Sequence, residues 1–265
     1  MLSFEKKTAL ITGASYGIGE AFAKALASKG ANVILVARSG DRLKKLASEL
    51  TRQFKIDAQV VIADLSDPKA SQKVFSAVAK RGQSVNILIN NAGVGTRGRF
   101  YSLPADKEHS EIMVNVAAVV SLTHLFLPSM VRKQDGIIIN VASGAAFQPV
   151  PFMAVYGATK AFVLSFSEAL WAEHRREGIR VLALCPGETE TNFEKAMGNT
   201  RGIFGRRRSV ESVVKTAFRS LERGKSYAVD GAMNYFLANS VRFTPRSVVA
   251  KMAARIMGPK KPRKK

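Results

Sequence analysis

A glycine-rich turn near the start of the chain limits the possible folds more than any other feature. Residues 7–11 (KTALI) are an apolar run, residues 12–19 read TGASYGIG, and residues 20–28 carry apolar side chains at helical spacing until Gly30. This order predicts a buried strand, a tight turn and a helix. The first backbone N–H groups of that helix would point at the turn, where they can bind a phosphate. The G-x-x-x-G-x-G spacing differs from the better-known G-x-G-x-x-G, so on its own the turn could also be a simple tight connection.

Alternation of short apolar runs with helical patterns continues through most of the chain. Repeated strand–helix units with apolar strands predict a doubly wound parallel sheet of about seven strands, with helices on both faces. The 265 residues, 46% of them hydrophobic, suit one large α/β domain or two small ones, and the unbroken strand–helix pattern favours one domain over residues 1–257. Ligands bind beyond the carboxyl ends of such strands. The predicted strands are 7–11, 32–37, 58–63, 86–89, 136–141, 179–184 and 226–229, and the predicted helices are 20–28, 41–53, 68–81, 111–132, 154–176, 209–223 and 245–257.

Arg38, followed by Ser39, comes directly after the second predicted strand. In dinucleotide-binding folds an acid at this place accepts a hydrogen bond from the ribose 2′-hydroxyl, whereas an arginine suits a 2′-phosphate. Together with the glycine turn, Arg38 favours the phosphate. The alternative is an ordinary solvated arginine at a strand end.

Tyr156 and Lys160 lie four residues apart in a predicted helix, which places their side chains on one face. An adjacent cation favours the phenolate form of a tyrosine. At about 4 Å and an effective dielectric constant near 20, one unit charge is worth about 4 kcal/mol, or about three pKa units. We therefore expect Lys160 to bring the pKa of Tyr156 toward the working pH, where a general acid or base is most effective. By spacing alone, the pair could also be an accident with a surface lysine.

Composition narrows the class of protein. Cys185 is the single cysteine, which excludes an intrachain disulfide and predicts a small buried side chain at a strand end. None of the three histidines has a partner at metal-ligand spacing, so we expect no metal site. Residues 112–131 are uncharged and long enough to cross a membrane, but Asn115 and Pro128 favour a buried core helix. Because the N-terminus lacks an apolar secretory run, we expect a cytoplasmic protein with no signal peptide and no transmembrane span.

The net charge of +21 is concentrated in the C-terminal quarter. Residues 201–265 contain 17 Lys and Arg against 3 acids, a balance of +14 that leaves +7 for the first 200 residues. Residues 245–257 predict a basic amphipathic helix, and residues 258–265 a basic, disordered tail. Two interpretations stay open: a packing helix with a solubilising tail, or a surface for an acidic partner, either an anionic membrane bound peripherally or an acidic acyl carrier. We do not expect a nucleic-acid partner, because no recognition motif accompanies the charge.

Six motifs agree in order and spacing with one known pattern: TGASYGIG at 12–19, NNAG at 90–93, Asn115, Ser143, YxxxK at 156–160 and PGETET at 186–191. In these motifs the chain resembles the short-chain dehydrogenase/reductase family, in its compact single-domain branch. The resemblance implies a Rossmann-type fold and an NADP-dependent oxidoreductase that interconverts a carbonyl and an alcohol. It also implies a homodimer or homotetramer built on the helices at 111–132 and 154–176.

The resemblance assigns catalytic roles to four residues. Tyr156 would give its proton to a substrate oxygen as a hydride reaches the carbon. Lys160 would depress the pKa of Tyr156 and hydrogen-bond the nicotinamide ribose. Ser143 would donate to the substrate oxygen, as an oxyanion-hole donor does. Asn115 would hold a water molecule that links Lys160 to solvent.

For the cofactor, NADP, the resemblance implies a site spread over the strand-end motifs. Arg38 and Ser39 would favour NADP over NAD, although Tyr16 stands where many NADP-preferring members carry a basic residue. Thr191 and the backbone near Thr189 would hold the nicotinamide carboxamide. The full implied set is Gly13, Ser15, Tyr16, Gly17, Ile18, Gly19, Arg38, Ser39, Asp64, Leu65, Asn91, Ala92, Gly93, Tyr156, Lys160, Pro186, Gly187, Thr189 and Thr191.

Apolar residues around the active-site motifs predict the substrate pocket. Residues 192–208, which contain three glycines, predict a mobile lid over it. Each pocket residue could instead be ordinary core packing. The predicted pocket residues are Ser143, Ala145, Phe147, Met153, Tyr156, Phe193 and Met197.

The leading hypothesis is therefore an NADPH-dependent reductase of an apolar, lipid-like ketone or aldehyde. The alternative is a non-catalytic NADP-binding interaction protein on the same fold, since a fold does not fix a function. Dehydratase or epimerase work on nucleotide sugars would require a larger substrate domain than the residues after Thr191 provide.

Overall fold

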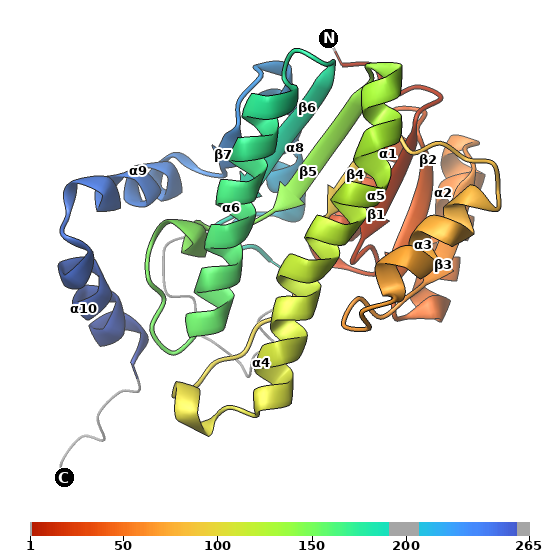
Figure 1. Cartoon of the computed structure of the whole chain (residues 1–265). Helices are drawn as coiled ribbons and strands as arrows, with labels where there is room; N and C mark the ends of the chain where they lie inside the picture. The colour runs from red at the N-terminus through yellow and green to blue at the C-terminus, as the bar shows by residue number, and fades with distance from the viewer. Residues whose placement is uncertain (1, 191–206, 259–265) are drawn as a thin grey trace.

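The computed structural model of the chain, which describes residues 2–190 and 207–258, is built around one parallel β-sheet (Figure 1). The strand order is β3-β2-β1-β4-β5-β6-β7, and every neighbouring pair runs parallel. The predicted seven-stranded, doubly wound sheet is thus confirmed. The strands are β1 (Thr8–Thr12), β2 (Asn32–Ala37), β3 (Ala58–Ile62), β4 (Ile87–Asn90), β5 (Gly136–Val141), β6 (Ile179–Cys185) and β7 (Tyr227–Val229).

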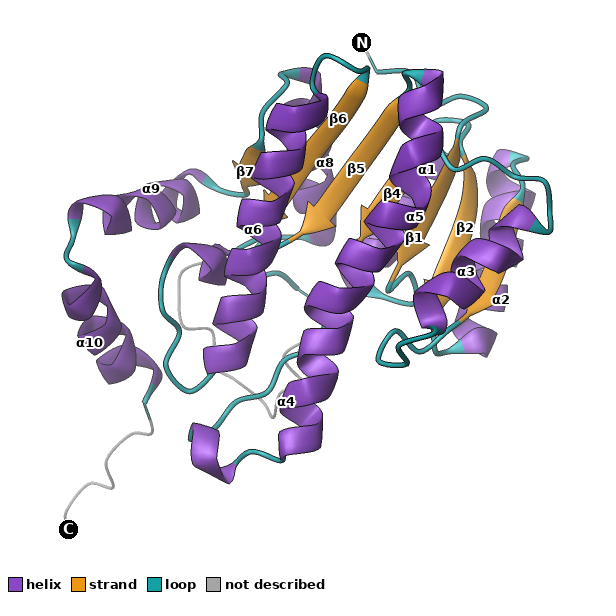
Figure 2. Cartoon of the chain, viewed as in Figure 1, coloured by secondary structure: helices purple, strands orange, loops and turns teal. Residues whose placement is uncertain are grey.

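Helices cover both faces of the sheet, as Figure 2 shows. Successive strand residues point to opposite faces, so in β1 the side chains of Ala9 and Ile11 join one buried core while Leu10 joins the other. Both faces need apolar residues, which explains why the strands are continuous apolar runs. The first core contains α1 (Gly17–Ala27), α2 (Gly40–Phe54) and α8 (Val210–Glu222); the second contains α3 (Ala70–Ala79), α5 (Ala118–Lys133) and α6 (Ala154–His174).

The strand order reverses between β1 and β4, and this places the site. β1 has β2 on one side and β4 on the other, so the loops after β1 and β4 leave the sheet in opposite directions. A crevice forms at such a switch point, beyond the carboxyl ends of the strands. The glycine turn after Thr12 and the NNAG segment that begins at Asn90 meet there.

The helix predicted at 111–132 is longer and interrupted. It starts as α4 (Ala105–Ile112) after Pro104, passes through one π-helical turn, η2 (Met113–Ala117), and continues as α5. Proline before the first turn and acids within it favour this earlier start. Within the described part of the chain, this is the one helix whose length and composition would allow a membrane span. Its buried residues pack on the sheet, in agreement with the predicted core helix.

The part of the chain after β7 forms an arm beside the sheet (Figure 1). It consists of α9 (Ala232–Ser240), the short 3-10 turn η4 (Val241–Phe243) and α10 (Arg246–Met257). The helix predicted at 245–257 agrees with α10, whereas α9 was not predicted. Its sequence, AMNYFLANS, has no clear apolar stripe, so helical periodicity gives no signal.

Arg208, the last residue of the predicted lid, is anchored. It forms a β-bridge with Thr189, and its Nε donates to Asp230 Oδ2 at 2.9 Å. The buried Asp230 carboxylate holds this arginine in place at the end of the predicted lid, and the mobility of that lid stays a prediction. The rest of the predicted lid, apart from residue 207, and the predicted tail after residue 258 lie outside the described residues.

Candidate active site

One pocket of about 650 Å³ lies at the carboxyl edge of the sheet. Its walls come from the loops after β1 to β6 and from the inner side of the C-terminal arm. The structure therefore brings together motifs that are far apart in the sequence. The predicted site residues that line it are Gly13, Ser15, Tyr16, Gly17, Ile18, Arg38, Ser39, Asp64, Leu65, Asn91, Ala92, Gly93, Ser143, Ala145, Phe147, Met153, Tyr156, Lys160, Pro186, Gly187 and Thr189.

Five predicted residues do not line the pocket in the described structure. Gly19 and Asn115 lie behind its wall. Thr191, Phe193 and Met197 fall outside the described residues.

The glycine turn has the geometry of a phosphate cradle. Gly13 has φ +64°, and a Cβ on Gly19 would lie 2.4 Å from the carbonyl oxygen of Gly13. Only glycine fits such positions without a shift of the backbone. Tyr16, the N-cap of α1, makes no side-chain capping bond. The first N–H groups of α1 are therefore available to an anion at the pocket wall formed by Gly17 and Ile18.

Thr12 and Asn91 brace this turn. Thr12 Oγ1 accepts hydrogen bonds from the backbone N–H groups of Asn91 and Ala92, both at 3.0 Å. Asn91 Nδ2 donates to the carbonyl oxygens of Thr12 at 2.9 Å and Gly13 at 3.2 Å. These bonds join the first and fourth strand ends, so the Asn91 side chain acts as a brace for the cradle.

Arg38 and Asp64 occupy the far end of the pocket. Arg38 Nη1 lies 3.9 Å from Asp64 Oδ2, and both side chains are largely exposed, at 66% and 49%. A backbone hydrogen bond from Ser66 lowers the pKa of Asp64, and Arg38 acts in the same direction. Because the pair is loose and solvated, the guanidinium remains available to a ligand phosphate.

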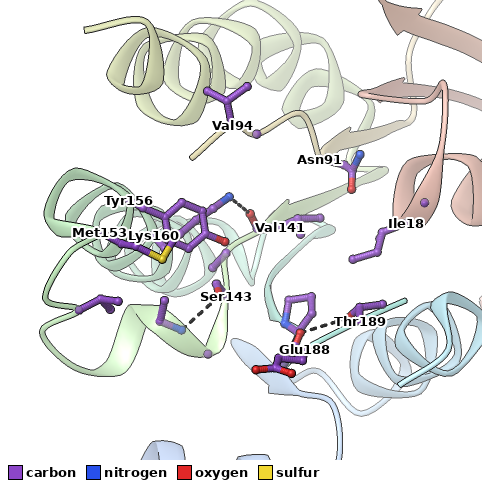
Figure 3. Close-up of a pocket in the computed structure, with 18 of the residues that line it drawn as sticks. Ile18, Asn91, Val94, Val141, Ser143, Met153, Tyr156, Lys160, Glu188 and Thr189 are labelled. Atoms are coloured by element: carbon purple, nitrogen blue, oxygen red, sulfur yellow. Dashed lines mark hydrogen bonds between the residues drawn. The ribbon is translucent and has the colours of Figure 1, made fainter. Parts of the chain in front are cut away.

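Ser143, Tyr156 and Lys160 meet at the opposite end, as Figure 3 shows. Tyr156 and Lys160 project from α6 and are nearly buried, at 9% and 4% exposure. Lys160 Nζ donates to the carbonyl oxygen of Val141 at 2.9 Å and lies 5.7 Å from the centroid of the Tyr156 ring. Ser143 Oγ accepts from the backbone N of Ala145 at 3.1 Å, and its hydroxyl also hydrogen-bonds the Tyr156 side chain.

Burial controls the protonation of this cluster. Burial raises the pKa of Tyr156 to about 12, while its hydrogen bond with Ser143 acts the other way. Burial also lowers the pKa of Lys160 to about 8. The pKa of Tyr156 thus lies above its ordinary value, opposite to the direction expected from the Lys160 charge, because desolvation disfavours the charged form of each group. At neutral pH the cluster holds a neutral phenol, a proton donor, beside an ammonium.

Asn115 lies in the π-helical turn and is buried. Its Oδ1 accepts from the backbone N of Val94 at 3.0 Å, and its Nδ2 donates to Thr159 Oγ1 at 3.1 Å. A Cβ on Gly93 would lie 3.4 Å from Asn115 Oδ1 and 3.3 Å from Lys160 Nζ. The two polar atoms thus converge beside Gly93, and the water-relay role of Asn115 stays a prediction.

A buried acid near Lys160 was not predicted. Glu111, in the last turn of α4, is fully buried, and its Oε2 accepts from the backbone N of Thr96 at 3.0 Å. Glu108, also buried, is hydrogen-bonded to Thr96 Oγ1. Burial raises the pKa of Glu111 to about 7, and the charge on Glu108 adds to the effect. The available signal was its place one helical turn before Asn115, on the same face.

Replacement of Glu111 by glutamine is expected to remove a pH dependence of stability. The folded pKa lies above that of an unfolded glutamate, so stability from this group is present below pH of about 4.5 and is lost as pH rises through about 7. The unfolding free energy of the natural protein should fall by about 2–3 kcal/mol more than that of the variant when the pH is raised from 5 to 8. Urea titrations at the two pH values measure this, with exposed Glu222→Gln as the matched control. Parallel curves for Glu111→Gln and the natural protein would contradict it.

Apolar residues surround the Ser143–Tyr156 end of the pocket. Ala145, Phe147 and Met153 line this end, as the sequence predicted. Val150 and Met153 belong to the same apolar cluster as Tyr156. The sequence did not assign the other wall, which comes from the arm. That wall contains Leu237, Val249, Met252, Ala253, Ile256 and Met257.

Comparison with known proteins identifies the family. The chain matches the short chain dehydrogenase family over residues 7–202, most of its length. It belongs to this family.

Three similar proteins are informative: one is named for its substrate, and two have solved structures that contain a cofactor. The human very-long-chain 3-oxoacyl-CoA reductase is 31% identical over 238 residues, which cover 87% of this chain and 74% of that protein. A short-chain dehydrogenase from Sphingobium yanoikuyae in complex with NADPH has a TM-score of 0.82 and 29% identity, covering 98% of this chain and 99% of the other. A short-chain dehydrogenase/reductase from Burkholderia phymatum in complex with NAD has a TM-score of 0.80 and 26% identity, with 99% of each chain covered.

These similarities establish a coarse function. The chain is an oxidoreductase of the short-chain dehydrogenase/reductase family, and its fold is the one these relatives share. Structurally similar members bind NAD or NADP, so family membership alone does not choose between the two.

Proposed function

We propose that this short-chain dehydrogenase/reductase uses NADPH to reduce a carbonyl group on an apolar, lipid-like substrate. One observation carries the proposal: a single pocket joins a phosphate cradle, an arginine at one end, a proton-donor cluster at the other and an apolar wall beyond it. Its volume lies in the range of small-molecule sites, about 300–1,000 Å³.

The residues present fit the cofactor. The cradle around Gly13 and Gly19 has no room for side chains, and the N-terminus of α1 faces it. Arg38 would hold the 2′-phosphate, and Lys160 the nicotinamide ribose. Bound NADPH would supply the hydride.

The protein would supply position and a proton. Ser143 Oγ–H would donate to the substrate oxygen and hold the carbonyl next to Tyr156. Tyr156 would then give its phenolic proton to that oxygen as negative charge develops there. Lys160, an ammonium below pH of about 8, would stabilise the phenolate that remains. Burial of Tyr156 and Lys160 strengthens the interaction between their charges, because the surroundings screen it less than water does.

The apolar wall and the name of the human relative support an acyl-chain substrate. A 3-oxoacyl thioester or a long-chain ketone would place its carbonyl at Ser143 and its chain along Phe147, Met153 and Met252. These side chains come from three separate segments: residues 144–147, the N-cap of α6, and α10.

Turnover is expected to rise with the chain length of the substrate. Each buried methylene is worth about 0.8 kcal/mol, so kcat/KM should increase about fourfold per added carbon until the wall is filled. NADPH oxidation with a series of 3-oxo esters of increasing length measures this. Met252→Ser should flatten the series, whereas Met233→Ser, exposed and outside the pocket, should not. A series that is flat for the natural protein would contradict an acyl-chain substrate.

We further propose a homodimer or homotetramer built on α4–α5 and α6. Exposed Ile112 and Phe162 support it, because they leave apolar surface on those helices. A cytoplasmic location likewise remains a proposal.

A further inference from the structure

The described chain concentrates its exposed apolar surface in the C-terminal arm, residues 232–257. Of the 14 large apolar side chains exposed on the described residues, 8 lie in this arm. Phe243 is 90% exposed, Met233 68% and Phe236 67%. Such clustering on a water-soluble surface usually marks a contact with a protein or a membrane. We call the following residues the arm patch: Met233, Phe236, Phe243, Val248, Met252 and Ile256.

Basic side chains flank the arm patch, and acids are absent from this part of the sequence. Residues 231–265 contain 9 Lys and Arg and no Asp or Glu. Four of these, Arg242, Arg246, Lys251 and Arg255, are exposed in the described structure. On α10, Val248, Met252 and Ile256 repeat every fourth residue and form a stripe, and Lys251 and Arg255 each directly precede a stripe residue.

A second exposed segment lies at the same end of the molecule. Phe100 and Tyr101, in the 3-10 turn η1 (Phe100–Ser102) before α4, are 65% and 83% exposed. The preceding loop is tied to the end of α10, because Arg97 Nη2 donates to the carbonyl oxygen of Met257 at 3.0 Å. Figure 1 shows both segments on the side of the molecule opposite the N-terminus. The apolar surface is thus contributed by two parts of the fold at the pocket end.

We propose that the C-terminal arm docks the protein on an anionic lipid bilayer. Interfacial helices carry large apolar residues on one side and Lys or Arg beside them, as α10 does. The apolar side chains would enter the headgroup boundary while the basic side chains, with their flexible stems, pair with anionic lipids. An acidic carrier protein would also suit the charge, but the apolar stripe of α10 with basic residues beside it is the arrangement of an interfacial helix and favours the bilayer. The docked arm would place the wall of the pocket next to the bilayer.

Vesicle flotation of the full chain tests this proposal. We expect binding to phosphatidylcholine vesicles that contain phosphatidylglycerol and none to phosphatidylcholine alone. Neutralising the arm (Arg242→Gln, Arg246→Gln, Lys251→Gln, Arg255→Gln) should reduce binding by roughly tenfold or more. Phe236→Ser with Phe243→Ser should do the same, and both residues lie outside the pocket.

The matched control carries the same charge change on α2 and its C-cap, Lys55. Lys44→Gln, Lys45→Gln, Arg52→Gln and Lys55→Gln alter exposed residues on the far side of the sheet from the arm (Figure 1). This variant should bind the anionic vesicles nearly as well as the natural protein. Circular dichroism and NADPH binding show that each variant is folded.

Four outcomes would overturn the proposal. An equal loss in the α2 variant would show unspecific attraction by net charge. Equal binding to neutral vesicles would remove the role of the basic residues. Absence of vesicle binding, with dissociation of an oligomer by the Phe236/Phe243 variant in sedimentation velocity, would make the patch an interface between copies of this chain. Absence of vesicle binding with arm-dependent binding of an acidic acyl carrier would make it a carrier site.

Discussion

Phenylalanine in place of Tyr156 is expected to lower kcat for carbonyl reduction by about 10²- to 10⁴-fold. The substitution removes the one group in the cluster that is poised to donate a proton to the substrate oxygen and then be stabilised by Lys160. It keeps the ring, which packs against Val150 and Met153, so the fold and the cofactor cradle should persist. NADPH should therefore bind with a nearly unchanged Kd. Steady-state kinetics and a fluorescence titration with NADPH measure the two quantities.

The matched control is Tyr101→Phe, which removes a phenolic hydroxyl from an 83% exposed side chain outside the pocket. It should keep full activity. Substantial activity in Tyr156→Phe would mean that another group is the acid. If the natural protein binds NADPH but turns over no member of a carbonyl panel, the non-catalytic alternative holds and the proposed reaction fails.

Much of the site could be predicted because of how parallel sheets are built. The carboxyl ends of parallel strands lie on one edge, so motifs at Thr12, Arg38, Asp64, Asn90 and Ser143 must meet there once the strand order is known. No packing detail is required for this inference. The spacing of Tyr156 and Lys160 likewise follows from helix geometry alone.

The protonation of the cluster could not be predicted in the same way. The interaction of Lys160 with Tyr156 was estimated for two charges in a medium of fixed dielectric constant. In the folded protein both groups are almost fully buried, and desolvation, which depends on the entire surrounding packing, becomes the largest effect.

Glu111 and the arm illustrate contacts that a sequence hides. Glu111 is buried because α4 packs on the loop that contains Thr96, and nothing local to a glutamate indicates that. The apolar side chains of α10 were recognised from their periodicity, but periodicity does not say what they face. In the fold, Met252 and Ile256 line the pocket although both are more than half exposed, whereas Val248 on the same stripe does not line it.

Exchange of Arg38 for aspartate is expected to change the cofactor preference by about 10²-fold. The ratio of kcat/KM for NADPH to that for NADH should be well above one in the natural protein and should fall by about this factor in the variant. A hydrogen bond to a charged group is worth about 1.5–3 kcal/mol, and the new carboxylate would repel the 2′-phosphate as well. Aspartate can also accept from the free 2′-hydroxyl of NADH, which should improve the use of that cofactor.

Stability should change little, since the ion pair with Asp64 is loose and exposed, with 3.9 Å between its nearest atoms. Arg52→Asp is the matched control, because it makes the same charge change on exposed α2 away from the pocket. Calorimetry with adenosine 2′,5′-bisphosphate and with 5′-AMP isolates the 2′-phosphate from the nicotinamide end. Loss of the difference between these two ligands in Arg38→Asp, but not in Arg52→Asp, would assign the 2′-phosphate to Arg38. An NADPH/NADH ratio that is unchanged in Arg38→Asp would show that Arg38 does not recognise the phosphate. A ratio near one in the natural protein would remove NADPH from the proposed function but would leave the roles of Ser143, Tyr156 and Lys160 intact.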